Sequence, residues 1–212
     1  MTLFTLGMRM IEPDISPTNG RYEYRVWPRH SLSATSDLHR DWVLALAERR
    51  ADIYLLGAHG MVDLVKLRDG TQLEIKQRGG DQLGLQFWQL ALSQDFPLSV
   101  FALNRLAAAF GLPRALPQSA GLSAAHLVAA LLWPINKVEA RIVEKSRLLF
   151  GRGTSTAEIT RVKLDNRSWM TVAVEDPDPV TAARMVASLD LAYLPNQSYG
   201  DFLRAGLLLN AE

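Results

Sequence analysis

Cationic side chains recur at alternate positions in separate segments of this chain. These residues are Arg21, Arg25, Lys66, Arg68, Lys76, Lys145 and Arg147. Arginine offers bidentate hydrogen bonds to phosphate, and lysine offers a compact positive charge. If the segments converge, their cations repel one another unless an anion or nearby carboxylates offset the charge. The pattern is therefore typical of a site for a ligand with several negative charges, such as a polyphosphate.

Four glutamates lie in or beside the same segments and could offset part of that charge. They are Glu23, Glu74, Glu158 and Glu175. A second interpretation of the pattern is an antiparallel sheet with one solvated face, which is common in proteins. In that case the charged side chains form only surface ion pairs and bind no ligand.

The segment from Val62 to Arg78 must position much of this charge, and it predicts two short strands joined at Asp69-Gly70. A two-residue loop would pair Lys66 with Leu73 and mix charged and apolar faces, whereas an odd-length loop keeps the faces separate. We therefore expect a three-residue connection, with Gly70 in the left-handed conformation of a bulge. The charged face would carry Lys66, Arg68, Glu74 and Lys76, opposite Val65, Leu67, Leu73 and Ile75.

Further strands and helices are expected on both sides of this hairpin. The expected strands cover residues 21–27, 52–56, 138–150, 157–164 and 169–175. One helix is expected from Ser36 or Asp37 to about Arg50. The pattern is helical from Gly79 to Pro134, with helices that begin near Pro97 and Ser123, and two more helices begin at Asp178-Pro179 and about Ser198.

Composition excludes several classes of function. The chain has 212 residues, 48% of them hydrophobic, and a net charge of +1, so no broad nucleic-acid surface and no DNA partner are expected. It has no cysteine, which excludes disulfides, thiolate zinc sites and cysteine nucleophiles. The longest apolar run, Ala120 to Ile135, is shorter than a membrane span of ~20 residues and predicts a buried helix. Without a clear secretory signal, the expectation is a cytoplasmic protein with no membrane partner.

Seven segments, in order, resemble the motifs of the CYTH superfamily, the triphosphate tunnel metalloenzymes. They are Arg21-Tyr-Glu23-Tyr-Arg25, Lys66-Leu-Arg68, Lys76, Lys145-Ser-Arg147, Glu158-Ile-Thr160, Ala173-Val-Glu175 and Ser198-Tyr199-Gly-Asp-Phe-Leu203. The resemblance spans about residues 21 to 204. It implies an α+β fold: a closed antiparallel β-barrel of about eight strands, with charged faces turned inward and helices packed outside. Residues 1–212 would form a single domain, with a helical insertion at about 81–134.

The resemblance also implies roles for individual residues. The cations that would bind the phosphates of a substrate are Arg25, Lys66, Arg68, Lys76, Lys145 and Arg147. The metal ligands, for Mg²⁺ or Mn²⁺, would be Glu23, Glu158 and Glu175, with Glu74 as a further candidate. Arg21, Thr160 and Ala173 stand where the family pattern is acidic, so we expect a weak metal site, and no catalytic residue is assigned.

Two functions follow from the resemblance. The first is a metal-dependent enzyme, either a triphosphatase acting on a nucleotide, thiamine triphosphate or polyphosphate, or an adenylyl cyclase-like enzyme. The second is a non-catalytic binder of a phosphate or other polyanion, in which the metal site has degenerated. A protein that keeps only the scaffold for interactions is a third alternative. The expected partner is a small-molecule triphosphate or polyphosphate, and homodimerisation stays open.

Overall fold

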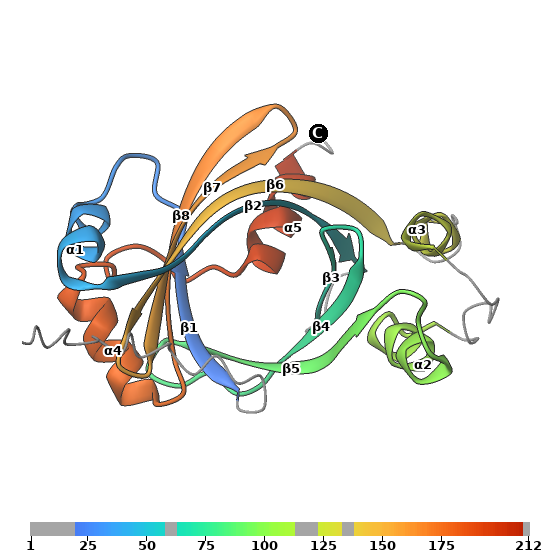
Figure 1. Ribbon diagram of the computed structural model, residues 1–212, viewed down its shortest axis with the longest axis horizontal. Helices are drawn as coiled ribbons and strands as arrows, with labels where there is room; N and C mark the ends of the chain where they lie inside the picture. The colour runs from blue at the N-terminus through green and yellow to red at the C-terminus, as the bar shows by residue number, and fades with distance from the viewer. Residues whose placement is uncertain (1–19, 58–62, 113–122, 133–137, 210–212) are drawn as a thin grey trace, which may run out of the picture.

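The computed structural model describes residues 20–57, 63–112, 123–132 and 138–209. Eight strands form a closed barrel, with five helices outside the sheet or at its end (Figure 1). The strands are β1 (Arg21–Val26), β2 (Val43–Leu56), β3 (Leu64–Arg68), β4 (Gln72–Arg78), β5 (Gln86–Asp95), β6 (Glu139–Arg152), β7 (Ser155–Leu164) and β8 (Arg167–Asp176). The helices are α1 (Ser33–Asp41), α2 (Val100–Ala109), α3 (Ala124–Leu131), α4 (Pro179–Ser188) and α5 (Tyr199–Leu209).

The order around the barrel is β1-β5-β4-β3-β2-β6-β7-β8, and every neighbouring pair is antiparallel. β1 closes the barrel, because it pairs with both β5 and β8. The expected fold class, an α+β protein with a closed antiparallel barrel of about eight strands, is confirmed.

The β3–β4 hairpin has the predicted odd-length connection. Lys66 pairs with Glu74, and Arg68 pairs with Gln72, which leaves a three-residue loop. Gly70 has a φ of 68°, as expected, and Asp69 is also left-handed at 49°, a conformation that aspartate tolerates better than most residues. The charged and apolar side chains of the two strands are therefore separated, and both faces of the hairpin were predicted correctly.

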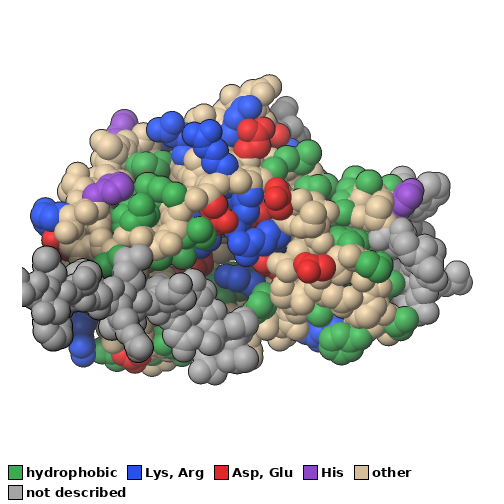
Figure 2. Space-filling model, in the orientation of Figure 1, with side chains coloured by type: hydrophobic (Ala, Val, Ile, Leu, Met, Phe, Trp, Pro, Cys, Tyr) green, Lys and Arg blue, Asp and Glu red, His purple; other side chains and the backbone are tan. Residues whose placement is uncertain are grey.

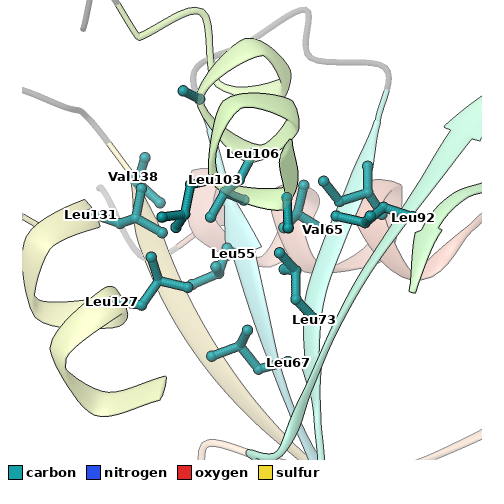
Figure 3. Packing of buried hydrophobic residues seen from close by; sticks show 13 residues of the cluster. Leu55, Val65, Leu67, Leu73, Leu92, Leu103, Leu106, Leu127, Leu131 and Val138 are labelled. Atoms are coloured by element: carbon teal, nitrogen blue, oxygen red, sulfur yellow. The ribbon is translucent and has the colours of Figure 1, made fainter. Parts of the chain in front are cut away.

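Two apolar clusters lie between the outer face of the barrel and the helices. One joins α2 and α3 to the outward-facing side chains of β2, β3, β4 and β5 (Figure 3). In this cluster Leu103 and Leu106 of α2 pack on Leu55, Val65 and Leu73 of the barrel. The second cluster lies beneath α1 and α4 and includes Trp42. Val100, at the start of α2, is half exposed.

Two of the expected elements are wrong. The helix predicted to run to about Arg50 ends at Asp41, and β2 begins at Val43. In β2 a bulge between Leu44 and Leu46 interrupts the alternation, and the spacing of Trp42 and Leu46 imitates a helical stripe. The helical pattern expected from Gly79 is also wrong, because β5 occupies residues 86–95 before α2 begins.

The remaining predicted elements agree with the structure to within a few residues, except that the strand expected at 52–56 is only the last part of β2. The Asp178 carboxylate caps α4 by accepting from the backbone N–H groups of Val180 and Thr181. Ser123 caps α3, which covers the described part of the apolar run from Ala120 to Ile135. Among the described residues, no helix combines the length and the apolar character needed to cross a membrane.

Candidate ligand-binding cavity

A cavity of about 470 Å³ lies inside the barrel, and charged side chains line it. Its cations are Arg21, Arg25, Arg50, Lys66, Arg68, Lys76, Lys145 and Arg147, and its carboxylates are Glu23, Glu74, Glu158 and Glu175. Figure 2 shows basic and acidic side chains gathered at the hollow in the middle of the molecule. All six cations and all four glutamates that the sequence singled out therefore converge in one space.

Glu158 on β7 is held between two arginines. It accepts from Arg25 Nη1 at 2.9 Å and from Arg147 Nε at 2.5 Å. Burial disfavours its charged form, but Arg147 and Arg25 outweigh that effect and hold the pKa of Glu158 well below its usual range. Because both of its oxygens are engaged by cations, Glu158 is poorly placed to bind a metal ion.

Glu74 on β4 is engaged in the same way. Lys66 Nζ lies 2.7 Å from one carboxylate oxygen and Arg68 Nη1 lies 3.2 Å from the other. The pKa of Glu74 is lowered because these cations outweigh the cost of burial. Glu74 therefore neutralises the β3 cations across the hairpin.

Two acidic residues of β2 complete this network, and the sequence reasoning missed both. Glu48 lies 2.6 Å from Arg50 Nη1 and 2.9 Å from Arg147 Nη1. Asp52, which is fully buried, accepts from Lys145 Nζ at 2.8 Å. The alternation of Glu48, Arg50 and Asp52 was visible in the sequence, but Glu48 and Arg50 were assigned to a helix and only Asp52 to a strand.

Lys145 is a strongly perturbed cation of the cavity. Its ammonium group donates to Asp52 and, at 2.7 Å, to the hydroxyl of Tyr54. Burial and the neighbouring Lys66 lower the pKa of Lys145 to about 7, although Asp52 opposes both effects. Asp52 itself keeps a pKa of about 2, because Lys145 and Lys66 outweigh its burial.

Glu23 and Glu175 form the remaining acidic pair, directly opposite each other on β1 and β8. Burial and the charge of Glu23 raise the pKa of Glu175, although Lys76 acts in the opposite direction. Arg25, at 3.0 Å, and Lys76 overcome burial and lower the pKa of Glu23. Arg21 lies 3.8 Å from Glu175. Among the described residues, Glu23 accepts hydrogen bonds through both oxygens, but from one arginine only, Arg25. The ion pair between Glu175 and Arg21 is long. Of the expected metal ligands, this pair is therefore the least engaged by cations in the described part of the chain.

No group of three or more histidine, aspartate or glutamate side chains is arranged to hold a metal ion in the part of the chain that the structure describes. Ala173, which stands where the family pattern is acidic, pairs with Arg25 on β1 and contributes no oxygen. The residues present therefore fit a divalent cation only through Glu23 and Glu175. Mg²⁺ is commonly bound through one or two carboxylates together with substrate phosphates, so two ligands are compatible with a ligand-dependent site.

Comparison with solved structures supports the fold. The PH1819 protein of Pyrococcus horikoshii OT3 has a TM-score of 0.50 and 10% identity, over 88% of this chain and 99% of that chain. A proposed adenylate cyclase from Bacillus halodurans has a TM-score of 0.48 and 10% identity, over 86% and 97%. A proposed adenylyl cyclase from Hippeastrum with a dominant triphosphatase activity has a TM-score of 0.44 and 10% identity, over 81% and 85%. No protein-family model and no curated protein matches the sequence.

The chain therefore shares the closed-barrel fold of the PH1819 protein. At 10% identity the likeness concerns the arrangement of the chain alone. The chemistry of this barrel must therefore be argued from its own side chains, above all from the ones that turn inward.

Proposed function

We propose that the CYTH-like barrel binds a triphosphate or another short phosphate polyanion in its cavity. The observation that carries this proposal is the charge of the lining, in which eight cations face four carboxylates. Counting Glu48 and Asp52 as well, which contact these cations, an excess of two positive charges remains. A low-dielectric interior strengthens the attraction of such a lining for an anion.

The cations differ in how freely they can reach a ligand. Lys76 has no ion pair within 4.0 Å to any described carboxylate. The side chain of Arg68 is 39% exposed, whereas that of Arg25 is 4% exposed and is saturated by two glutamates. Lys76 and Arg68 therefore offer the first contacts for phosphate oxygens, while Arg25 keeps the acidic side chains in place.

The buried cations would contact the ligand after Lys76 and Arg68 have made the first contacts. A phosphate oxygen that approaches Arg147 competes with Glu48, which pairs with it at 2.9 Å and is partly exposed. The planar guanidinium can hold two oxygens at once, so Arg147 can keep Glu158 while it exchanges Glu48 for the ligand. Binding thus consists of replacing carboxylate partners by phosphate oxygens.

Metal-dependent hydrolysis is the second candidate, and the Glu23–Glu175 pair favours it. These two carboxylates would hold Mg²⁺ or Mn²⁺ together with phosphate oxygens, and the cation would neutralise charge on the phosphate that is cleaved. The raised pKa of Glu175 fits this role, because a divalent cation would favour the carboxylate form that burial and Glu23 disfavour.

The test is calorimetric titration with inorganic triphosphate in the presence of a chelator. We expect binding without a divalent cation, and about tenfold or greater weakening in Arg68→Ala and Lys76→Ala, since hydrogen bonds to charged groups are involved. Lys163→Ala is the matched control, because Lys163 is exposed and pairs with Glu144 outside the cavity. Absence of binding, or equal weakening by the control, would refute the proposal. Phosphate release that needs Mg²⁺ or Mn²⁺ and is lost in Glu23→Gln would establish the second candidate.

A further inference from the structure

Helix α5 packs into one end of the barrel rather than on its outer face (Figure 1). Tyr199 and Leu203 of α5 form a cluster with Tyr54, Val143 and Val162, which belong to β2, β6 and β7. Tyr54 lies two residues after Asp52 in β2, and Val162 lies two residues after Thr160 in β7, so each pair shares one face of its strand. The cluster therefore continues the inward-facing side of the strands. The charged part of the cavity is therefore bounded on this side by an apolar layer.

Tyr199 is the first residue of α5, and its side chain connects this layer to the charged lining by contacting two of the cations. Its ring centroid lies 4.0 Å from Lys145 Nζ and 4.7 Å from Arg25 Cζ, and it stacks on Tyr54 at 5.4 Å. Two cations at this distance from one ring are held by its negative face. Tyr199 therefore fixes the innermost cations in position.

The hydroxyl of Tyr199 has no hydrogen-bond partner among the described residues, although it is buried. Tyr199 lines the cavity and is only 6% exposed. Buried polar atoms without partners are rare in proteins and often mark a place where a ligand or water belongs. A neutral phenol beside Arg25 and Lys145 is suited to donate to an anion that these cations attract.

We propose that Tyr199 binds the terminal phosphate of the ligand and that the barrel recognises the end of a linear phosphate chain. This inference rests on the proposed function. Among the described residues, the aliphatic side chains of the layer beyond Tyr199, which are Leu56, Val143, Val162 and Leu203, offer no cation for a further phosphate. The phosphate chain would therefore end there. Burial raises the pKa of Tyr199, which keeps the hydroxyl protonated as a donor.

End recognition is tested on the unmodified protein with two ligands that contain four phosphorus atoms. Linear tetraphosphate has two free ends, whereas cyclic tetrametaphosphate has none. We expect the linear ligand to bind at least about tenfold more tightly, by calorimetry in the presence of a chelator. Equal affinity for the two ligands would overturn the inference and leave the proposed function intact. Failure of both ligands and of inorganic triphosphate to bind would instead remove the proposed function.

The role of Tyr199 is tested by Tyr199→Phe, which keeps the ring and removes only the hydroxyl. We expect about tenfold to hundredfold weaker binding of linear tetraphosphate, because a hydrogen bond to a charged group is lost. Affinity for tetrametaphosphate should be unchanged, so the preference for the linear ligand should shrink. Tyr193→Phe is the control, since Tyr193 is 64% exposed. Unchanged preference in Tyr199→Phe, with the melting temperature of the unliganded protein also unchanged, would contradict the assignment.

Discussion

Glu158 and Arg25, which are 133 residues apart in sequence, meet inside the barrel at 2.9 Å. This contact joins β7 to β1 over the intervening strand β8, and Arg147 completes it from β6. Ion pairs between strands thus hold the interior of the barrel together. The side chains that stabilise the barrel are therefore the same ones that the proposed function uses.

Glu158→Gln should destabilise the protein strongly. The substitution leaves Arg25 and Arg147 with a neutral partner in a buried site, where loss of one member of an ion pair costs about 3–5 kcal/mol. Urea unfolding at neutral pH measures the change in the free energy of unfolding. Glu144→Gln, at an exposed ion pair with Lys163, should cost about 0–1 kcal/mol or less. Equal effects of the two substitutions would show that the interior network contributes no more than a surface pair.

Part of this network could be predicted from the sequence, because it depends on the alternation of side chains within single strands and one hairpin. The β3–β4 hairpin predicts its own register, because Lys66 and Glu74 lie opposite only with an odd-length loop. The cations of β6 follow from alternation within one strand. Information of this kind depends on neighbours in sequence, and it places the cations on one face of each strand. That these faces meet in one cavity was implied only by the resemblance to the CYTH superfamily.

The partners of the glutamates could not be predicted in the same way. Glu158 was expected to bind a metal ion, whereas it pairs with Arg25 and Arg147 through strand order around the whole barrel. Glu48 was missed because the bulge between Leu44 and Leu46 interrupts the alternation of β2, and the segment up to Arg50 was predicted to be a helix. Asp52 lies in the strand predicted at 52–56, but its partners Lys145 and Lys66 come from other strands, so its place in the network did not follow from its own segment.

Binding of triphosphate near neutral pH should take up protons at Lys145. Burial places the pKa of Lys145 at about 7 in the free protein, so part of the population is neutral there. An anion beside it favours the ammonium form and raises that pKa. Calorimetry at pH 7.5 in buffers of different ionisation enthalpy should therefore show proton uptake, of up to about one proton. Lys145→Met should abolish the uptake, whereas Lys163→Met should leave it unchanged.

The lowered pKa of Lys145 also determines whether the free energy of unfolding of the free protein rises or falls with pH. Lys145 binds its proton less tightly in the folded state than in the unfolded state, in which its pKa has the ordinary value of 10.5. The free energy of unfolding should consequently rise with pH between about 7 and 10.5 through this residue. Comparison of urea midpoints for the native chain and Lys145→Met across this range isolates the contribution. A slope that persists in Lys145→Met belongs to another group and would contradict the assignment.

Glu175→Gln should stabilise the free protein at neutral pH. The pKa of Glu175 is raised by burial and by Glu23, so its ionisation opposes folding once the pH exceeds the folded-state pKa. The amide removes this cost, and the difference in melting temperature from the native chain should shrink as the pH falls. Glu139→Gln, at a carboxylate that is 57% exposed, is the control. A loss of stability in Glu175→Gln at neutral pH would mean that Arg21 and Lys76 hold Glu175 as a carboxylate.

Glu48→Gln should strengthen the binding of triphosphate while it weakens the fold. Glu48 contacts Arg50, Arg147 and, at 3.7 Å, Arg68, so in the free protein it occupies positions that phosphate oxygens would take. An amide cannot neutralise these cations, and a ligand no longer has to displace a carboxylate. We expect a several-fold lower Kd, with a loss of about 1 kcal/mol in the free energy of unfolding, since this carboxylate is only partly buried. Glu139→Gln should change neither quantity. Weaker binding in Glu48→Gln would show that Glu48 orients Arg147 and Arg68 for the ligand and does not compete with it.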